Sequence, residues 1–213
     1  MGRLINGING PFIGKVGSVV GSSRKGNPYI KGLPKKRTKN ISDKELANRK
    51  RFAVAQSWLR PLTVYVRAGF KGYTATAEGF IAAKSYLLHH AMVLEDGNFK
   101  VLSPQMKVSF GTLALPSSFE VVQSTANELT FTWDTACPKG TSAFDQAMPL
   151  AYDPTSEHAC FEITGNFRKD GSMTLRVDAT PGTVYQVYLA FCAADRQSQS
   201  DSIYLGEVEM LAI

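Results

Sequence analysis

The chain has 213 residues, of which 44% are hydrophobic, so it can bury one large core or two small ones. No apolar run approaches the roughly 18–20 residues of a membrane helix, and the N-terminus lacks the apolar stretch of a signal peptide. These features exclude a helical membrane protein and argue against Sec-dependent export. We therefore expect a cytoplasmic or particle-associated protein with no membrane partner.

The formal net charge of +6 conceals an uneven distribution. Residues 1–51 carry thirteen Lys or Arg and two Asp or Glu, a balance of +11, which leaves −5 for the remaining residues. A basic segment joined to a mildly acidic body indicates either a polyanionic partner or head-to-tail contact between subunits. The three cysteines form no Cys-x-x-Cys pair, which is typical of single thiols in a reducing compartment.

Residues 1–40 are predicted to form a Gly-rich, basic arm. The segment 15–21 is rich in β-branched residues, 22–27 has the composition of a turn, and 28–32 is expected to return as a second strand. A helix is disfavoured because each Gly would cost about 1 kcal/mol and Pro11 about 3 kcal/mol. The arm is therefore interpreted as a hairpin or a pair of strands, followed by a basic linker.

The Gly14-Lys15 pair raises the question of a phosphate-binding loop. A Walker-type loop needs four residues between its glycines and a Ser or Thr after the lysine, between a strand and a helix. Only three residues separate Gly10 from Gly14, and Val16 follows the lysine. No nucleotide site is predicted, and the glycines are interpreted as positions where two backbones approach closely.

The apolar residues of the arm are too many to leave in water, so we expect them to dock on the helices or on another copy of the chain. The candidate assembly residues are Gly10, Phe12, Ile13, Gly14, Val16, Gly17, Val19, Val20, Gly21, Tyr29 and Ile30. The candidate polyanion-binding residues are Lys15, Arg24, Lys25, Lys31, Lys35, Lys36, Arg37, Lys39, Arg49, Lys50 and Arg51.

Residues 41–97 are predicted to be helical. Ser42 and Glu45 have the spacing of a capping box at the start of the first helix. Apolar residues then recur at helical spacing up to Pro61, which ends that helix and suits the start of the next. The segment 74–93 predicts a further helix.

From residue 98 to residue 213 the period of the apolar residues changes from 3.6 to 2, which predicts a β-domain. The candidate strands are 105–110, 118–123, 128–134, 146–152, 159–164, 172–178, 184–192 and 202–210. Several short strands separated by Gly, Pro and Asp turns favour a β-sandwich. The complete chain is thus expected to have an α+β fold with segments 1–40, 41–97 and 98–213.

Residues 113–212 resemble a fibronectin type III or Ig-like sandwich. Trp133 ends an early strand, and Pro181-Gly182-Thr183 directly precedes a strand that begins with Tyr185. The resemblance implies a seven-stranded Greek-key sandwich with Trp133 and Tyr185 in or beside its core. It also implies a hydrogen bond from the Tyr185 hydroxyl to the backbone near this turn. Such modules are scaffolds and spacers, so the resemblance implies no catalysis.

Nearly the whole chain resembles an uncharacterised family from the Bacteroidetes. The resemblance rests on "INGINGPFIGKVGSVVGSSRKGNPYIKGLP", "RKRFAVAQSWLRPL", "GFKGY" and "YLAFCAADRQSQSDSIYLGEV". Members of that family have a Gly-Lys-Val-Gly arm, a helical middle and a C-terminal β-domain, and the resemblance implies this architecture without any activity. Members often carry Trp where this chain has Arg24, so no stacking role is expected at that turn.

No catalytic, cofactor or metal site is predicted. His89 and His90 point about 100° apart on a helix and cannot bind one metal together, while His158 is distant from both in the sequence. No serine stands in a Gly-x-Ser-x-Gly motif, and no cysteine has the sequence context of a nucleophile. The acidic residues of the sandwich loops are expected to be solvated: Asp145, Asp153 and Glu157.

Three classes of function remain open. The first is a non-enzymatic structural protein that forms homo-oligomers through the basic arm, as in a phage-like or filamentous particle. The second is sequence-independent binding of nucleic acid by the basic residues. The third is an enzyme of unknown type. The first is favoured because the arm interleaves lysines with apolar residues and has almost no aromatic platform for bases; no cofactor or small-molecule substrate is expected.

Overall fold

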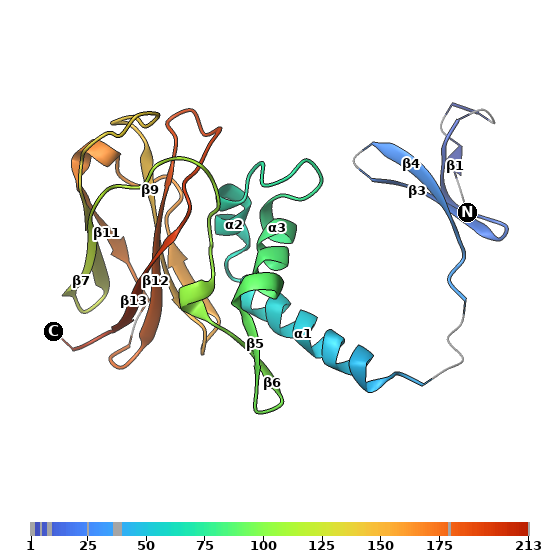
Figure 1. Cartoon of the computed structure of the whole chain (residues 1–213), viewed down its shortest axis with the longest axis horizontal. Coiled ribbons are helices and arrows are strands. Elements are labelled where there is room, and N and C mark those ends of the chain that lie inside the picture. Colours follow the sequence, from blue (N-terminus) through green and yellow to red (C-terminus); the bar gives the residue numbers. More distant parts are fainter. Residues whose placement is uncertain are drawn as a thin grey trace. The chain divides into compact units, whose positions relative to one another are not determined.

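The computed structural model describes residues 3–4, 6–7, 10–24, 26–35, 40–178 and 180–212 (Figure 1). The chain divides into two compact units, Met1–Asp43 and Lys44–Ile213. The described residues are mostly β, in four antiparallel sheets, with three short α-helices. This composition is compatible with the predicted α+β class. None of the helices in the described ranges has the length and apolarity needed to span a bilayer.

The N-terminal unit is a four-stranded sheet with the order β1-β2-β3-β4. Its strands are β1 (Arg3–Leu4), β2 (Phe12–Val16), β3 (Val19–Arg24) and β4 (Asn27–Gly32). The segment 15–21, which was expected to contribute the first strand of a hairpin, is divided by a two-residue loop at Gly17 and Ser18. Gly17 has φ +58°, which is the conformation that a type II′ hairpin turn requires at its first loop position. The expected pair of strands is therefore a meander.

The first helix of the second unit agrees with the prediction, whereas the last helix differs from it. They are α1 (Asp43–Leu59), α2 (Thr63–Gly69) and α3 (Gly79–Tyr86), the last continuing as the π-helix η2 (Leu87–Ala91). α1 begins directly after Ser42 and ends before Pro61, as predicted. The predicted helix 74–93 is wrong at both ends.

The helix is shorter than predicted at both ends, and each end has a local cause. Before α3, the Thr74 and Ala77 backbones are joined by a hydrogen bond of 2.9 Å, and the Thr74 hydroxyl accepts the Ala77 N–H. After η2, β5 (Met92–Glu95) pairs with β6 (Asn98–Val101). The Asp96-Gly97 loop between these strands has φ of +48° and +76°, the conformation that favours Asp-Gly in tight hairpins.

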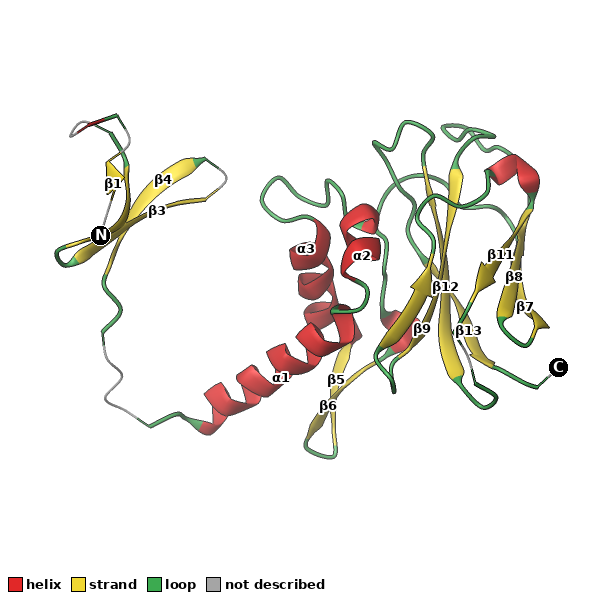
Figure 2. Ribbon diagram, turned by 180° about the vertical axis from the view of Figure 1, so that it is seen from behind, coloured by secondary structure: helices red, strands yellow, loops and turns green. Residues whose placement is uncertain are grey.

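The rest of the second unit contains two larger sheets, with the orders β10-β9-β12-β13 and β11-β8-β7. Their strands are β7 (Phe119–Thr125), β8 (Glu128–Trp133), β9 (Gln146–Asp153), β10 (His158–Phe161), β11 (Ser172–Arg176), β12 (Val184–Cys192) and β13 (Ile203–Glu209). Each strand predicted from residue 118 onward coincides with one of them. The two sheets enclose a common core, as in a β-sandwich (Figure 2).

The predicted strand 105–110 is wrong. A short 3₁₀ helix, η3 (Ser103–Gln105), occupies its start, and the residues that follow are irregular. The Phe110 N–H donates to the Gly69 carbonyl at 2.8 Å, and the Ser109 hydroxyl donates to the Ser200 carbonyl at 2.7 Å. These hydrogen bonds to the end of α2 and to a distant loop replace the ladder of a strand.

The two central strands of the four-stranded sheet, β9 and β12, are buried on both faces. Both strands are buried at every position except the first. Alternate residues of these strands face two different cores. On one side is the sandwich core, where Trp133 contacts Phe191. On the other side is a core shared with the helices, where the Tyr65 hydroxyl donates to the Met148 carbonyl at 2.7 Å. Figure 2 shows the helices beside this sheet.

The positions implied for Trp133 and Tyr185 are confirmed. Both side chains are buried in the sandwich core. The Trp133 Nε1–H donates to the Arg168 carbonyl at 2.8 Å, and the Tyr185 hydroxyl donates to the Asp178 carbonyl at 3.1 Å. The second bond ties β12 to the segment that precedes the Pro181-Gly182 turn, as the resemblance implied.

Candidate functional site

The strand register of the N-terminal sheet separates the candidate residues onto two faces. Directly paired residues of an antiparallel sheet project on the same side, and side chains alternate along each strand. The apolar face, as we name it, contains the pairs Val16–Val19 and Gly21–Ile30. The lysine face is the opposite one, and its members include Ile13, Lys15, Val20, Ser22, Arg24, Tyr29 and Lys31.

The apolar face is only partly covered by the unit's own residues. The Phe12 ring lies over Gly21, where an added Cβ would be 2.7 Å from Phe12 Cδ2 and would overlap the Phe12 carbonyl oxygen. Gly21 is thus a point of close approach, as predicted for the arm glycines, whereas an added Cβ at Gly17, Gly26 or Gly32 would have no atom within 4 Å. Ile30, however, is 65% exposed, and Val16 is 49% exposed. Hydrophobic side chains therefore remain in contact with water on this face.

β4 forms one edge of the N-terminal sheet. It is the last strand in the sheet order, and all six of its residues are exposed. No other strand in the described ranges pairs with its outer side. An edge strand presents unpaired N–H and C=O groups that can pair with another chain, and Pro28 removes one donor from the row. The edge and the apolar face meet at Ile30.

The lysine face holds cations that are exposed to solvent: Lys15, Arg24 and Lys31. Tyr29 is the aromatic residue among them, and Lys35 is exposed just after the sheet. Four further candidate cations lie outside the described residues: Lys25, Lys36, Arg37 and Lys39. The other candidate assembly residues lie around β2, where Gly10 N–H donates to the Gly7 carbonyl at 3.3 Å and Ile13 pairs with Arg3.

The three candidate cations of α1 differ in their contacts. The Arg49 guanidinium forms an ion pair with the Glu45 carboxylate at 2.8 Å. Arg51 donates to the carbonyl oxygen of Leu88 in η2, so its guanidinium joins two helical segments. Lys50 is exposed. The sequence spacing did not reveal that Arg51 has this contact within the fold.

A groove between α1 and α3 was not predicted, because its residues fit the spacing of core-facing side chains. It has a volume of about 420 Å³ and is lined by Phe52, Gln56, Phe80, Ile81, Lys84, Ser85, Leu88 and His89. Phe52 and Ile81 are exposed, and the Lys84 ammonium lies 5.1 Å from the centroid of the Phe52 ring. The groove is mainly apolar, and Lys84 contributes a cation to its lining.

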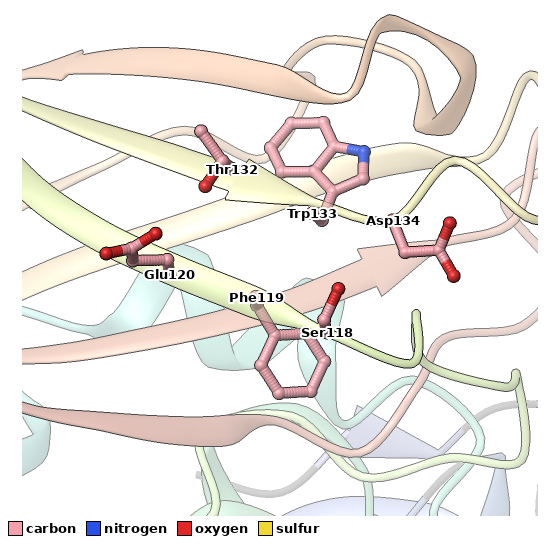
Figure 3. Close-up of a pocket in the computed structure, with 6 residues that line it drawn as sticks. All are labelled: Ser118, Phe119, Glu120, Thr132, Trp133 and Asp134. Atoms are coloured by element: carbon pink, nitrogen blue, oxygen red, sulfur yellow. The ribbon is translucent and has the colours of Figure 1, made fainter.

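A pocket of about 530 Å³ lies along β7 and β8 (Figure 3). Phe119 and Trp133 are paired across the strands, and the polar lining residues belong to the opposite face. In Figure 3 the carboxylates of Glu120 and Asp134 are at opposite ends of the pocket. The Ser117 hydroxyl and the Ala136 N–H bind the Asp134 carboxylate and lower its pKa. The pocket therefore presents separated carboxylates rather than an acid–base pair.

Two acidic residues expected to be solvated are buried. Asp145 accepts the Ser142 N–H at 2.9 Å and lies with Oδ2 3.4 Å from Nε of the buried Arg168. The Arg168 guanidinium also lies 4.6 Å from the centroid of the Phe191 ring. Asp153 accepts N–H and hydroxyl donors from the turn that follows it. The expectation failed because the loops fold inward and supply donors that pair these charges.

The histidines are placed partly as expected. The rings of His89 and His90 are 6.3 Å apart, and His90 contacts the Tyr86 ring. His158, which is isolated from other histidines in the sequence, lies beside Cys160 and Asp178. Asp178 is far from His158 along the chain, so spacing alone could not show this cluster.

The comparison with protein families matches residues 11–206 to a family model described as a family of unknown function, DUF6266. The match extends from the N-terminal sheet to β13 and includes both units. No curated protein matches the chain. The chain therefore belongs to DUF6266, a family of unknown function.

Proposed function

We propose that this protein is a non-enzymatic structural protein that self-associates through its N-terminal sheet. The observation that carries the proposal is the exposed apolar face, with Val16 and Ile30 beside the open edge of β4. A single sheet is stable when a second layer covers its apolar side. A second copy of the chain is the partner that we propose for this face.

The charge distribution supports a head-to-tail contact between copies. The basic segment 1–51 would meet the mildly acidic remainder of a neighbour, and complementary charge favours their encounter. Heterologous contacts of this kind build rings or open filaments, which are the assemblies of shells, tails and fibres. On this proposal, residues 1–40 act as the assembly arm, 41–97 as a helical support and 98–213 as the outward-facing module.

The sandwich supports the same proposal through its topology. Its two antiparallel sheets, one of three strands and one of four, support the resemblance to a fibronectin type III-like module. Modules of this kind are scaffolds in many proteins, although the fold alone does not assign a function. We extend the resemblance to this chain as a part of the proposal.

The experiment replaces the exposed apolar residues and leaves the fold intact. The double variant Val16→Asn/Ile30→Asn is compared with the wild type and with Val122→Asn, since Val122 on β7 is 46% exposed and serves as a matched control. Light scattering coupled to size-exclusion chromatography gives the mass at low and high salt. We expect oligomers of the wild type and the control, and monomers of the double variant. A monomeric wild type at high protein concentration, or an oligomeric double variant, contradicts the proposal.

The lysine face supports a second candidate function, sequence-independent binding of nucleic acid. Because Lys15 and Lys31 project away from the apolar face, the two functions can be separated by mutation. On duplex DNA each neutralised phosphate adds about 0.9 to the magnitude of the salt slope. Lys15→Ser/Lys31→Ser should therefore reduce that slope by roughly 2 for every DNA sequence.

The control for this test is Lys139→Ser, which removes an exposed cation from a sandwich loop. Fluorescence anisotropy with duplexes of random sequence measures the slope for each protein. The apolar-face double variant should bind DNA with the wild-type slope if assembly and binding are independent. Negligible DNA binding by the wild type at low salt rejects the second function and leaves the first untouched.

A further inference from the structure

Three potential metal ligands converge at one side of the sandwich. His158 and Cys160 lie on β10, two residues apart, so both side chains project from the same side of this strand. Asp178 follows β11. Since β10 and β11 are edge strands of different sheets, the three side chains join the two layers of the sandwich. Within the described ranges, no other three His, Cys, Asp or Glu side chains converge in this way.

The distances between the donor atoms suit a tetrahedral ion. His158 Nε2 lies 3.5 Å from Cys160 Sγ and 3.5 Å from Asp178 Oδ2, and the three donor atoms are all within 4.8 Å of one another. Bonds of about 2.0–2.3 Å to a tetrahedral Zn²⁺ place neighbouring ligand atoms roughly 3.3–3.8 Å apart. The Asp178 side chain is 88% exposed, so its carboxylate is free to rotate and shorten the remaining distance, which joins it to Cys160 Sγ.

The same three residue types also occur in cysteine nucleophile triads, but the geometry here differs. In a triad the imidazole receives the thiol proton at one ring nitrogen and is oriented by a carboxylate at the other. Here the thiol and the carboxylate both approach Nε2 of His158. The atoms are arranged around a common point and not along a relay.

We propose that His158, Cys160 and Asp178 bind one Zn²⁺ ion that bridges the two sheets of the sandwich. A thiolate and an imidazole select zinc over Mg²⁺ or Ca²⁺, which prefer sets of oxygen ligands. The backbone of Asp178 is already positioned, because its carbonyl accepts the Tyr185 hydroxyl at 3.1 Å. This inference does not depend on the proposed assembly function.

Three protein ligands leave the fourth coordination position open to water. A pocket beside the ligands is lined by His158 and Asp178 together with Asp153, Ser156, Thr180, Thr183 and Tyr185. Hydroxyl groups in this lining can hydrogen-bond a coordinated water. Because the ion binds the folded state, it stabilises the sandwich in proportion to the logarithm of its free concentration.

The test uses the full-length protein after treatment with a chelator. Isothermal titration with Zn²⁺, and with Mg²⁺ as a comparison, measures stoichiometry and affinity, while Co²⁺ substitution reports a thiolate ligand through its near-ultraviolet charge-transfer band. We expect one Zn²⁺ per chain, no Mg²⁺ binding at the same concentrations, and a higher Tm with Zn²⁺ than without it. The Co²⁺ band should be present in the wild type and absent in Cys160→Ser.

Two variants and two matched controls make the result specific. Cys160→Ser and Asp178→Asn should each weaken Zn²⁺ binding by about tenfold or more. Because Asp178 is exposed, Asp178→Asn keeps the test valid if the cysteine variant does not fold. Cys137→Ser and His89→Gln remove an exposed thiol and an exposed imidazole elsewhere and should leave the affinity unchanged. Absence of Zn²⁺ binding by the wild type, or an equal loss in Cys137→Ser, overturns the proposal.

Discussion

The N-terminal sheet and the sandwich are both antiparallel, yet their strands are buried to very different extents. β9 and β12 are buried along nearly their whole length, because the β11-β8-β7 sheet covers one face and the helices cover the other. Among the described residues of the N-terminal sheet, Gly21 alone is buried and none belongs to a hydrophobic core. The local pattern produces strands in both regions, whereas burial requires a second layer. The exposed apolar face is therefore the surface through which we propose that the chain self-associates.

The largest expected effect on the free energy of unfolding concerns the ion pair that is buried in the sandwich. Asp145→Ala leaves the fully buried Arg168 guanidinium without its counter-ion, which should reduce the free energy of unfolding by about 3–5 kcal/mol. Urea unfolding measures the change. Asp145→Ala/Arg168→Met, which removes both charges, should recover a large part of the loss. If the single variant loses less than about 1 kcal/mol, the pair is not desolvated as described.

A smaller effect is expected from overpacking the N-terminal sheet. Gly21→Ala places a methyl group against the Phe12 ring and carbonyl, and such overpacking typically costs about 1–3 kcal/mol. Gly32→Ala is the control, because no atom lies within 4 Å of a Cβ at Gly32. Hydrogen exchange of the β2–β4 amides should be faster in Gly21→Ala only, with the global unfolding midpoint unchanged. A shift of that midpoint in Gly21→Ala would show that the two regions unfold together.

A third comparison uses one hydroxyl in each region. Tyr185→Phe removes the hydrogen bond to the Asp178 carbonyl and should destabilise the metal-free protein by about 0.5–1.5 kcal/mol. Tyr29→Phe makes the same chemical change on the exposed strand β4 and should have almost no effect. Denaturant unfolding of both variants provides the measurement. Equal losses of stability in the two variants would mean that the hydrogen bond of the Tyr185 hydroxyl does not stabilise the fold.

The smallest effect concerns a loop of the sandwich. The Thr164 hydroxyl, at 2.8 Å, and the N–H groups of Thr164 and Ile163 bind the Glu162 carboxylate and lower its pKa. The resulting stabilisation is present at pH above the pKa of Glu162 in the unfolded chain and is lost as the pH falls through its lower folded pKa. Thr164→Val should raise the pKa of Glu162 toward its ordinary value in an NMR titration. Thr174→Val, on β11, is the control that should leave it unchanged.

Several features that were missed depend on contacts between distant parts of the chain. The segment 105–110 is irregular because its backbone bonds to Gly69 and to the loop before β13. Arg168 is buried because Asp145 and the Ala114 carbonyl meet its guanidinium. No period or motif within either segment contains this information. The β5–β6 hairpin differs, because its Asp96-Gly97 turn is a local signal that could have been recognised.

The resemblance to fibronectin type III modules implied the core positions of Trp133 and Tyr185. By itself, the sequence determined the strands from residue 118 onward and the start and end of α1. These features depend on side-chain alternation, helix capping and turn residues, which act over a few neighbouring positions. Only the tertiary structure decided that β9 and β12 are buried on both faces, that Lys15 and Lys31 lie on the face opposite to Val16 and Ile30, and that His158, Cys160 and Asp178 converge. Strand pairing and layer packing set these arrangements, and both join residues that the chain order keeps apart.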